Sequence, residues 1–213
     1  MRLLVFTQKV DKNDSVLGFF HSWLEALSYR FDKIIVICLQ AGPYNLPDNI
    51  EIYSLGKDIL PSRWSYIKKF YKFLWSFRKD YDSVFVHMNQ EYVLLGGIFW
   101  RLLSKKIYMW RNHHSGSLLT DIAVFLCNKV FCTSRFSYTA RFKKTVLMPV
   151  GVDTELFKRY PEIERSESSV LSLGRISKVK MPDLLVKVLA ELLEEKVNFR
   201  ALFVGDPAPD EKT

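Results

Sequence analysis

The sequence predicts an α/β fold, in which a Rossmann-like, doubly wound parallel sheet is followed by an incomplete second Rossmann-like domain. Three features predict it. Short, almost wholly apolar segments recur, stretches with apolar residues at helical spacing separate most of them, and the alternation starts again after a polar stretch at 158–168. Strands that are apolar throughout are typical of parallel sheets with helices on both faces. Hydrophobic residues make up 48% of the 213, which suffices for a sizeable core.

The first 150 residues contain the segments that we expect to form the main sheet, since each is a short apolar run. These predicted strands lie at 3–7, 33–39, 50–55, 83–87, 106–110, 129–132 and 145–148. Apolar residues at helical spacing predict helices at 16–27, 62–79, 90–103, 118–127 and 134–142. Residues 8–15 are polar and are predicted to form a loop after the first strand.

A second domain is predicted after residue 168. The stretch 158–168 is polar and contains Pro161, as linkers between domains do. Beyond it, a strand at 169–173, a helix at 183–193 and a strand at 199–204 form one βαβ unit. We therefore expect domains at 1–157 and 169–213. Because a lone βαβ unit cannot bury both faces of its sheet, we expect a truncated second domain and hence a fragment.

The turn inside this βαβ unit is rich in cations. Gly174 ends the strand, Arg175 and Lys180 follow on the turn, and Pro182 suits the first turn of the next helix. Such a loop can direct backbone N–H groups and two positive side chains at one anion, as a phosphate-bearing ligand requires. The alternative is a solvated basic turn with no ligand.

Polar residues follow most of the predicted strands, at the edge where ligands bind in open parallel sheets. Three of the four histidines, His87, His113 and His114, lie there. A histidine at a strand end can equally be a structural residue. The other residues that we expect to line a cleft or hinge at these ends are Gly18, Ser134, Gly151, Asp153, Gly205 and Asp206.

Several motifs are missing from the sequence. No GxGxxG follows the first strand, which disfavours an NAD-dependent enzyme, and GxxxxGK[ST], HExxH and GxSxG do not occur. Asp11 and Asp14 could be read as paired carboxylates for acid/base work, although solvation in a Lys-rich loop is the simpler interpretation.

The cysteines and the apolar runs bear on the cellular compartment. Cys38, Cys127 and Cys132 form no CxxC pair, so we expect no metal site and no disulfide framework, and a reducing cytoplasm fits best. The longest mostly apolar run, 92–103, is shorter than the ~20 residues of a bilayer span.

The chain is basic, with a formal net charge of +8, and the first 160 residues carry 23 Lys and Arg against 13 Asp and Glu. The predicted helix between Arg63 and Lys79 combines cations with an apolar stripe of Ile67, Phe70, Tyr71, Leu74 and Phe77. The stripe can face the sheet, while the basic side makes peripheral contact with an anionic membrane at its cytoplasmic face. Nucleic acid is not expected as a partner, since no nucleic-acid-binding motif accompanies the charge.

Three motifs in the second half resemble the retaining GT-B glycosyltransferases of family 4. They are MPVGVDTELF at 148–157, VLSLGRISKVK at 170–180 and LFVGD at 202–206, which match that family's hinge, phosphate loop and following turn in order and spacing. Upstream, SVFVHMN at 83–89, IYMWRNHH at 107–114 and VFCTS at 130–134 are similar to strands of its N-terminal domain. The resemblance covers essentially the whole chain, but only the first half to two-thirds of such an enzyme. Because the family's downstream pair of glutamates, which contacts the donor, is not in this sequence, the resemblance implies a fragment that is inactive alone.

The resemblance implies two facing Rossmann-like domains, the first for a glycan or lipid-linked acceptor and the second for a nucleotide-diphosphate sugar. Arg175, Lys180 and Gly174 would hold the donor diphosphate, and His114, or else His113, would lie beside the donor sugar. No metal and no tightly bound cofactor are implied. Met181 and Val150 stand where the family usually has glycine and asparagine, and only Gly18 stands where it commonly has adjacent glycines. The alternative is a non-catalytic carbohydrate- or lipid-binding module.

Overall fold

The computed structural model describes residues 1–59, 62–164 and 168–207. The chain divides into two compact units, Met1–Gly151 and Val152–Thr213. The domain boundaries expected from the sequence, at 157 and 169, stay a prediction. Residues 165–167 of the predicted linker and 208–213 of the predicted second domain lie outside the described residues.

The first unit is built on a seven-stranded sheet in the order β3-β2-β1-β4-β5-β6-β7, and each neighbouring pair is parallel. The strands are β1 (Arg2–Val10), β2 (Lys33–Ala41), β3 (Ile50–Ser54), β4 (Ser83–His87), β5 (Lys106–Trp110), β6 (Lys129–Cys132) and β7 (Thr145–Leu147). Each was expected from its apolar run. The predicted doubly wound α/β fold is confirmed for this unit.

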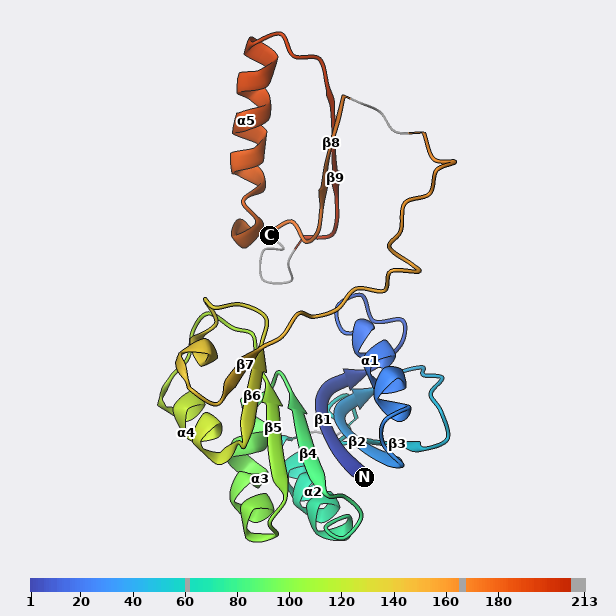
Figure 1. Ribbon diagram of the computed structural model, residues 1–213, viewed down its shortest axis with the longest axis vertical. Coiled ribbons are helices and arrows are strands. Elements are labelled where there is room, and N and C mark those ends of the chain that lie inside the picture. Colours follow the sequence, from blue (N-terminus) through green and yellow to red (C-terminus); the bar gives the residue numbers. More distant parts are fainter. Residues whose placement is uncertain (60–61, 165–167, 208–213) are drawn as a thin grey trace. The chain divides into compact units, whose positions relative to one another are not determined.

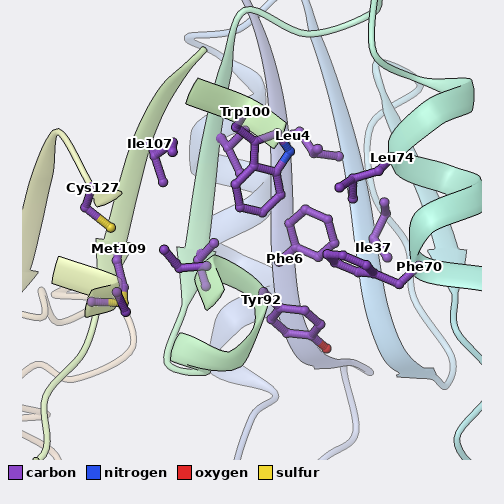
Figure 2. Close-up of a cluster of buried hydrophobic side chains, with 14 of the residues drawn as sticks. Leu4, Phe6, Ile37, Phe70, Leu74, Tyr92, Trp100, Ile107, Met109 and Cys127 are labelled. Atoms are coloured by element: carbon purple, nitrogen blue, oxygen red, sulfur yellow. The ribbon is translucent and has the colours of Figure 1, made fainter. Parts of the chain in front are cut away.

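Helices lie on both faces of the sheet (Figure 1). They are α1 (Phe19–Ser28), α2 (Arg63–Ser76), α3 (Gln90–Leu102) and α4 (Leu118–Leu126), and a short 3-10 helix, η1 (Tyr138–Arg141), precedes β7. The layer formed by α2, α3 and α4 buries an aromatic core against the sheet (Figure 2). In this core, the ring centroids of Phe70, Tyr92 and Trp100 lie 5.0–5.4 Å from the ring centroid of Phe6 in β1. On the other face, Phe20 and Leu24 of α1 pack into a second core.

The α1 face of the sheet is only partly covered. Over β4, β5 and β6 it leaves an apolar groove of about 430 Å³, whose lining includes Phe85, Tyr108 and Phe131. Trp23 of α1 and Met148 after β7 also line this groove. Helices cover both faces of the sheet, as expected from the apolar strands, but the cover on the α1 face is partial over β4, β5 and β6.

The predicted bounds of four segments were wrong. Residues 8–10, predicted as loop, continue β1, because Lys9 and Val10 pair with Gln40 and Ala41 of β2. Helix α1 starts at Phe19 instead of 16, since Oδ1 of Asp14 accepts the N–H groups of residues 16 and 17 in a turn. The predicted helix at 134–142 is reduced to the four residues of η1, and α2 is shorter than the predicted 62–79.

The second unit contains the predicted βαβ arrangement. Parallel strands β8 (Ser169–Leu173) and β9 (Arg200–Val204) flank a short 3-10 turn, η2 (Lys178–Lys180), and helix α5 (Pro182–Glu194). Met181 lies between η2 and α5 in the left-handed region, with φ +52° and ψ +48°. None of the helices among the described residues is long and apolar enough to cross a bilayer.

Candidate functional site

The strand order reverses between β1 and β4, and the carboxyl ends of this pair mark the position where open α/β sheets bind ligands. Thr7 and His87 lie at this position. Nδ1 of His87 is 3.1 Å from Oγ1 of Thr7, so the two strand ends are joined by a hydrogen bond between side chains. The predicted cleft residue His87 is therefore located at the topological switch point.

His87 is enclosed by aromatic side chains of the segment that opens α1. Its ring stacks on Phe20 at 4.1 Å between ring centroids, and Phe19 and Trp23 lie at 5.9 and 5.7 Å. Burial lowers the pKa of His87 to about 4, because an imidazolium would lose its hydration here. Nε2 has no hydrogen-bond partner among the described residues. His87 is thus a neutral, buried side chain at physiological pH.

The residue after His87 lies at the centre of a strained turn. Met88 has φ +70°, and the Asn89 N–H donates to the His87 carbonyl at 2.9 Å, two residues back. A γ-turn with positive φ is rare for a residue with a side chain. The Met88 N–H in turn donates to the Trp110 carbonyl of β5 at 2.7 Å, so the strained turn is held in place by the neighbouring strand.

A cleft of about 500 Å³ opens next to this position, on the side of the sheet covered by α2 and α3. Polar and charged side chains line it from four different segments, namely Gln8, Lys57, Arg63, Asn89 and Glu91. Aromatic side chains of α2 and α3, among them Tyr66 and Tyr92, complete the lining. Planar apolar rings beside hydrogen-bonding groups suit a small polar ligand with an apolar face.

The predicted histidines His113 and His114 lie on the loop between β5 and α4, termed the histidine loop (residues 111–117). Three of its carbonyls are tethered. The hydroxyl of Thr139 donates to the Arg111 carbonyl at 3.1 Å, the Tyr138 N–H donates to the His113 carbonyl at 2.9 Å, and the Arg111 guanidinium donates to the Ser115 carbonyl at 3.1 Å. The 137–139 segment therefore fixes the loop to the carboxyl edge of the sheet.

The two histidine rings stack on each other, with 4.7 Å between centroids and 21° between planes, and both side chains are exposed. Nδ1 of His113 lies 3.1 Å from the backbone nitrogen of Ser115 and 2.9 Å from its hydroxyl, so the His113 ring is held against the residue two positions on. The His114 ring makes no hydrogen bond within the described part of the chain. It is the side chain of the loop most available to a ligand.

Arg111 is a candidate that the sequence did not single out. Its guanidinium is half-buried at the carboxyl end of β5, and it forms no ion pair with any described carboxylate. Burial lowers the pKa of Arg111 from its usual value, although the group keeps its proton at physiological pH. Glu91 acts on this charge only from beyond ion-pair distance, so the guanidinium can attract an anionic ligand. The feature of the sequence that could have identified Arg111 is its position directly after a predicted apolar strand.

Other predicted residues of this edge have local structural roles. Gly18 caps α1 where the chain turns tightly, and a Cβ there would lie 2.5 Å from the Asp14 carbonyl oxygen. Oγ of Ser134 accepts the Phe136 N–H at 3.1 Å within the turn after β6.

Asp11 and Asp14 both pair with Lys9, at 3.0 and 2.7 Å, so they stabilise the loop before α1 instead of being freely solvated. The lysine and two backbone N–H groups lower the pKa of Asp14 to about 2. Neither carboxylate is suited to proton transfer near neutral pH.

In the second unit, the predicted phosphate loop lies at the carboxyl ends of β8 and β9. Gly174 and Gly205 follow these strands with φ +145° and +150°, and the Gly174 N–H donates to the Val204 carbonyl at 2.9 Å. A Cβ on Gly205 would lie 1.9 Å from the Gly174 carbonyl oxygen, so glycine is required there. The Ile176 N–H donates to the Asp206 carbonyl at 2.9 Å and ties the two turns together.

Arg175 and Lys180 are exposed on this loop, and neither forms an ion pair with any described carboxylate. Lys180 immediately precedes the left-handed residue Met181, from which α5 starts, so both cations lie close in sequence to the positive end of that helix. The predicted residues Gly174, Arg175, Lys180, Gly205 and Asp206 are thus brought to one edge of one βαβ unit.

The two remaining predicted residues lie in the segment after β7. Gly151 has φ +83°, and Oδ1 of Asp153 accepts the N–H groups of Glu155 and Leu156 at 2.9 and 3.1 Å. Asp153 therefore stabilises a local turn. In the described residues, no group of three or more His, Cys, Asp or Glu side chains is arranged to hold a metal ion.

The sequence matches no family model, and no curated protein matches it. Solved structures match the fold. A lipopolysaccharide outer core galactosyltransferase, WaaB, in its apo form superposes with a TM-score of 0.65 at 12% identity, over 100% of this chain and 63% of that protein. A glycosyltransferase from Rickettsia africae gives a TM-score of 0.62 at 14% identity, over 96% of this chain and 61% of that protein.

A UDP-GlcNAc 2-epimerase from Methanocaldococcus jannaschii also matches, with a TM-score of 0.51 at 13% identity, over 100% of this chain and 67% of that enzyme. This chain thus spans somewhat over three-fifths of the two transferases. At these identities the likeness concerns the fold, and it confirms the Rossmann-like α/β architecture.

Proposed function

We propose that the protein to which this chain belongs is a nucleotide-sugar-dependent glycosyltransferase of the retaining GT-B type. It would move a sugar from a nucleoside-diphosphate donor to a glycan or lipid-linked acceptor. The observation that carries the proposal is the loop after β8, where Arg175 and Lys180 lie between Gly174 and the start of α5 without a described carboxylate partner. The fold likeness to two glycosyltransferases supports it.

The chemical task of Arg175 and Lys180 would be to bind the diphosphate and to neutralise the charge that grows on it as the glycosidic bond breaks. Backbone N–H groups at the start of α5 add partial positive charge. Guanidinium and ammonium groups can do this work without a metal ion. Retention is then expected to follow a front-face route, in which the leaving phosphate helps to deprotonate the acceptor hydroxyl.

For the acceptor, we propose the cleft of the first unit. Its amide and charged side chains, such as Gln8, Asn89 and Glu91, can hydrogen-bond sugar hydroxyls, while the half-buried Tyr66 offers a ring for the apolar face of a pyranose. His114, or else His113, keeps the role predicted for it beside the donor sugar. Since His114 is exposed and makes no described hydrogen bond, its ring is available for that role.

Calorimetric titration of the 213-residue chain with UDP and GDP tests the phosphate loop. We expect one of the two nucleotides to bind, and the double variant Arg175→Ala, Lys180→Ala to weaken binding by at least roughly 100-fold, since each charge-assisted contact contributes about 1.5–3 kcal/mol. Lys187→Ala is the matched control, because Lys187 is an exposed cation in the middle of α5.

Equal binding by wild type and the double variant, or no binding of either nucleotide, would contradict the assignment of this loop. The transferase reaction is tested on the protein at its natural length, with a panel of UDP- and GDP-sugars and release of the free nucleotide as the readout. Release that depends on an added glycan or glycolipid supports transfer.

A second candidate is a nucleotide-sugar epimerase, which the match to a UDP-GlcNAc 2-epimerase favours. The same panel separates the candidates. An epimerase converts the sugar of the added donor without requiring an acceptor, whereas a non-catalytic carbohydrate- or lipid-binding module would bind its ligand and leave every donor unchanged.

We also propose a cytoplasmic location. Cys38, Cys127 and Cys132 are all buried and free, which fits a reducing compartment. Fractionation of the native host cells checks this, and recovery of the protein from an oxidising compartment would contradict it.

A further inference from the structure

Helix α2 carries a second set of large side chains that the core does not use. Its inner face buries Phe70 and Leu74 against the sheet, and Figure 2 shows both pointing into the aromatic core. On the opposite side, Trp64 and Trp75 are 73% and 62% exposed. Two exposed lysines, Lys68 and Lys72, lie between them at helical spacing, so a tryptophan flanks the lysine pair at each end of the outer side of α2.

Tyr71 belongs to this outer surface as well. It was expected in the buried stripe, but it is 45% exposed and its hydroxyl donates to the Leu95 carbonyl of α3 at 3.1 Å. The ring of Trp75 lies 6.3 Å from that of Phe99, also in α3. The outer surface of α2 therefore continues without a break onto α3.

Helices α3 and α4 extend the apolar surface. On α3, Leu95, Ile98 and Leu102 are exposed at spacings of three and four residues, and on α4 Ile122 and Phe125 are exposed three residues apart. The two helices are in close contact, since a Cβ on Gly97 of α3 would lie 2.8 Å from Leu126 of α4.

We call this continuous surface the α2–α4 face. It consists of Trp64, Lys68, Tyr71, Lys72, Trp75, Leu95, Ile98, Leu102, Ile122 and Phe125.

The charge on the face has one sign along α2. The segment 63–79 contains Arg63, Lys68, Lys69, Lys72, Arg78 and Lys79 and no Asp or Glu. Arg78 lies over the ring of Trp75 at 4.3 Å, so a cation also flanks the exposed tryptophan. We propose that the α2–α4 face docks on a lipid bilayer rich in anionic headgroups, with α2 lying in the plane of the interface.

The chemistry of the face fits a bilayer surface better than a protein or a nucleic acid. Tryptophan and tyrosine favour the headgroup region, lysines bind anionic headgroups, and leucine, isoleucine and phenylalanine can enter the acyl boundary. In a two-fold dimer the same surface would meet itself, so Lys68 and Lys72 would face a partner surface of the same positive sign. Exposed aliphatic residues such as Ile98 and Leu102 would make no hydrogen bond or ion pair with the phosphates of a nucleic acid.

Co-sedimentation of the 213-residue chain with vesicles tests this docking, and it does not depend on transferase activity. The vesicles are phosphatidylcholine alone and phosphatidylcholine mixed with phosphatidylglycerol. We expect binding to the mixed vesicles only, weakened by added salt because the attraction is electrostatic. Trp64 and Trp75 supply a direct signal, since Trp100 and Trp110 are buried and the half-buried Trp23 packs on the opposite, α1 side of the sheet. The emission of Trp64 and Trp75 should shift to shorter wavelength on binding.

Two variants remove the two components of the face. Lys68→Gln with Lys72→Gln should weaken partitioning by about tenfold or more, given the attraction of each cation to an anionic surface. Trp64→Ala with Trp75→Ala should weaken it and abolish the emission shift. Lys12→Gln with Lys143→Gln is the matched control, since both lysines are exposed outside the face, and it should bind like wild type.

Circular dichroism melts establish that each variant is folded, and Ile98→Ser with Leu102→Ser on α3 replaces the tryptophan variant if that one unfolds. The proposal is overturned by absent binding to the mixed vesicles, by equal binding to neutral vesicles, or by an equal loss in the Lys12, Lys143 control. A dimer of the 25.0 kDa chain that the Lys68, Lys72 variant leaves intact and the Trp64, Trp75 variant dissociates would assign the face to a second copy and likewise overturn it.

Discussion

Nδ1 of His87 hydrogen-bonds Oγ1 of Thr7 at 3.1 Å, and this contact joins the carboxyl ends of β1 and β4, where the strand order of the sheet reverses. The imidazole is therefore a neutral structural element at the position where a ligand would be expected. The consequence is a pH dependence of folding, whose sign follows from the buried ring.

Stability should fall as the pH is lowered from about 6.5 to about 4. Burial lowers the pKa of His87 to about 4, whereas the same group in the unfolded chain titrates near 6.5. Between these values the unfolded state holds more protons, so acid favours it by up to about 1.4 kcal/mol per pH unit. Urea unfolding at several pH values measures the slope.

The variant His87→Phe tests whether His87 causes this dependence of the unfolding free energy on pH. Phenylalanine keeps an aromatic ring on Phe20 and removes the titrating group, at a cost of about 1 kcal/mol for the lost hydrogen bond of Thr7. The unfolding free energy of the variant should depend less steeply on pH over the same range. Identical slopes for variant and wild type would show that other groups control the acid sensitivity.

Met88→Gly should stabilise the first unit by about 1 kcal/mol. The residue has φ +70° in the turn after His87, where glycine avoids the strain that a side chain creates, although glycine also raises the entropy of the unfolded chain. Met148→Gly is the comparison, since Met148 is similarly exposed and is not among the positive-φ residues. The Met148→Gly variant should be less stable than the wild type. A loss of stability in both variants would mean that the packing of Met88 outweighs its backbone strain.

Gly205→Ala should damage the phosphate loop more than Gly174→Ala does. Both glycines have positive φ, so each substitution strains the backbone by about 1 kcal/mol or more. A Cβ at 205 would also lie 1.9 Å from the Gly174 carbonyl oxygen, while a Cβ at 174 has no described atom within 4 Å. Amide hydrogen exchange of β8 and β9 reports the difference, and equal exchange in the two variants would contradict it.

Gly116→Ala should shift the histidine loop. A Cβ on Gly116 would lie 2.2 Å from the ring of Tyr138, which is held in place by Asp121 through a hydrogen bond of 2.9 Å. We expect a loss of about 1–3 kcal/mol and changed NMR signals of His113 and His114.

Combining Gly116→Ala with Tyr138→Ala tests whether the clash with the tyrosine ring causes the loss of stability. If the clash with the tyrosine ring is responsible, the two changes are strongly non-additive and Gly116→Ala becomes nearly neutral in that background. Additive losses in unfolding free energy would place the origin elsewhere in the loop.

The strands were predictable from sequence because a parallel sheet needs apolar side chains on both faces. Strands β4, β5 and β6 have the predicted bounds, since a polar residue or a turn stops each apolar run at both ends. Periodicity was less reliable on α2. Tyr71 has the spacing of a buried residue, yet neighbouring α3 lies on that side and offers the Leu95 carbonyl to its hydroxyl at the surface.

The site was predictable as a set of strand ends, and less so as a set of roles. His87 was expected in a cleft, but its aromatic enclosure depends on Phe19 and Phe20, whose position follows from the turn that Asp14 makes with residues 16 and 17. Arg111 becomes a candidate only in the structure, where its guanidinium is half-buried and forms no ion pair with a described carboxylate. Long-range contacts of this kind leave no periodic trace in a sequence.

The tethers of the histidine loop have a consequence for how it can change. They hold it by the carbonyls of residues 111, 113 and 115, so its anchoring depends on the main chain and leaves the ring of His114 uninvolved. Position 114 can therefore accept other side chains without refolding. A library of substitutions there would therefore test the role proposed for His114 separately from the stability of the loop.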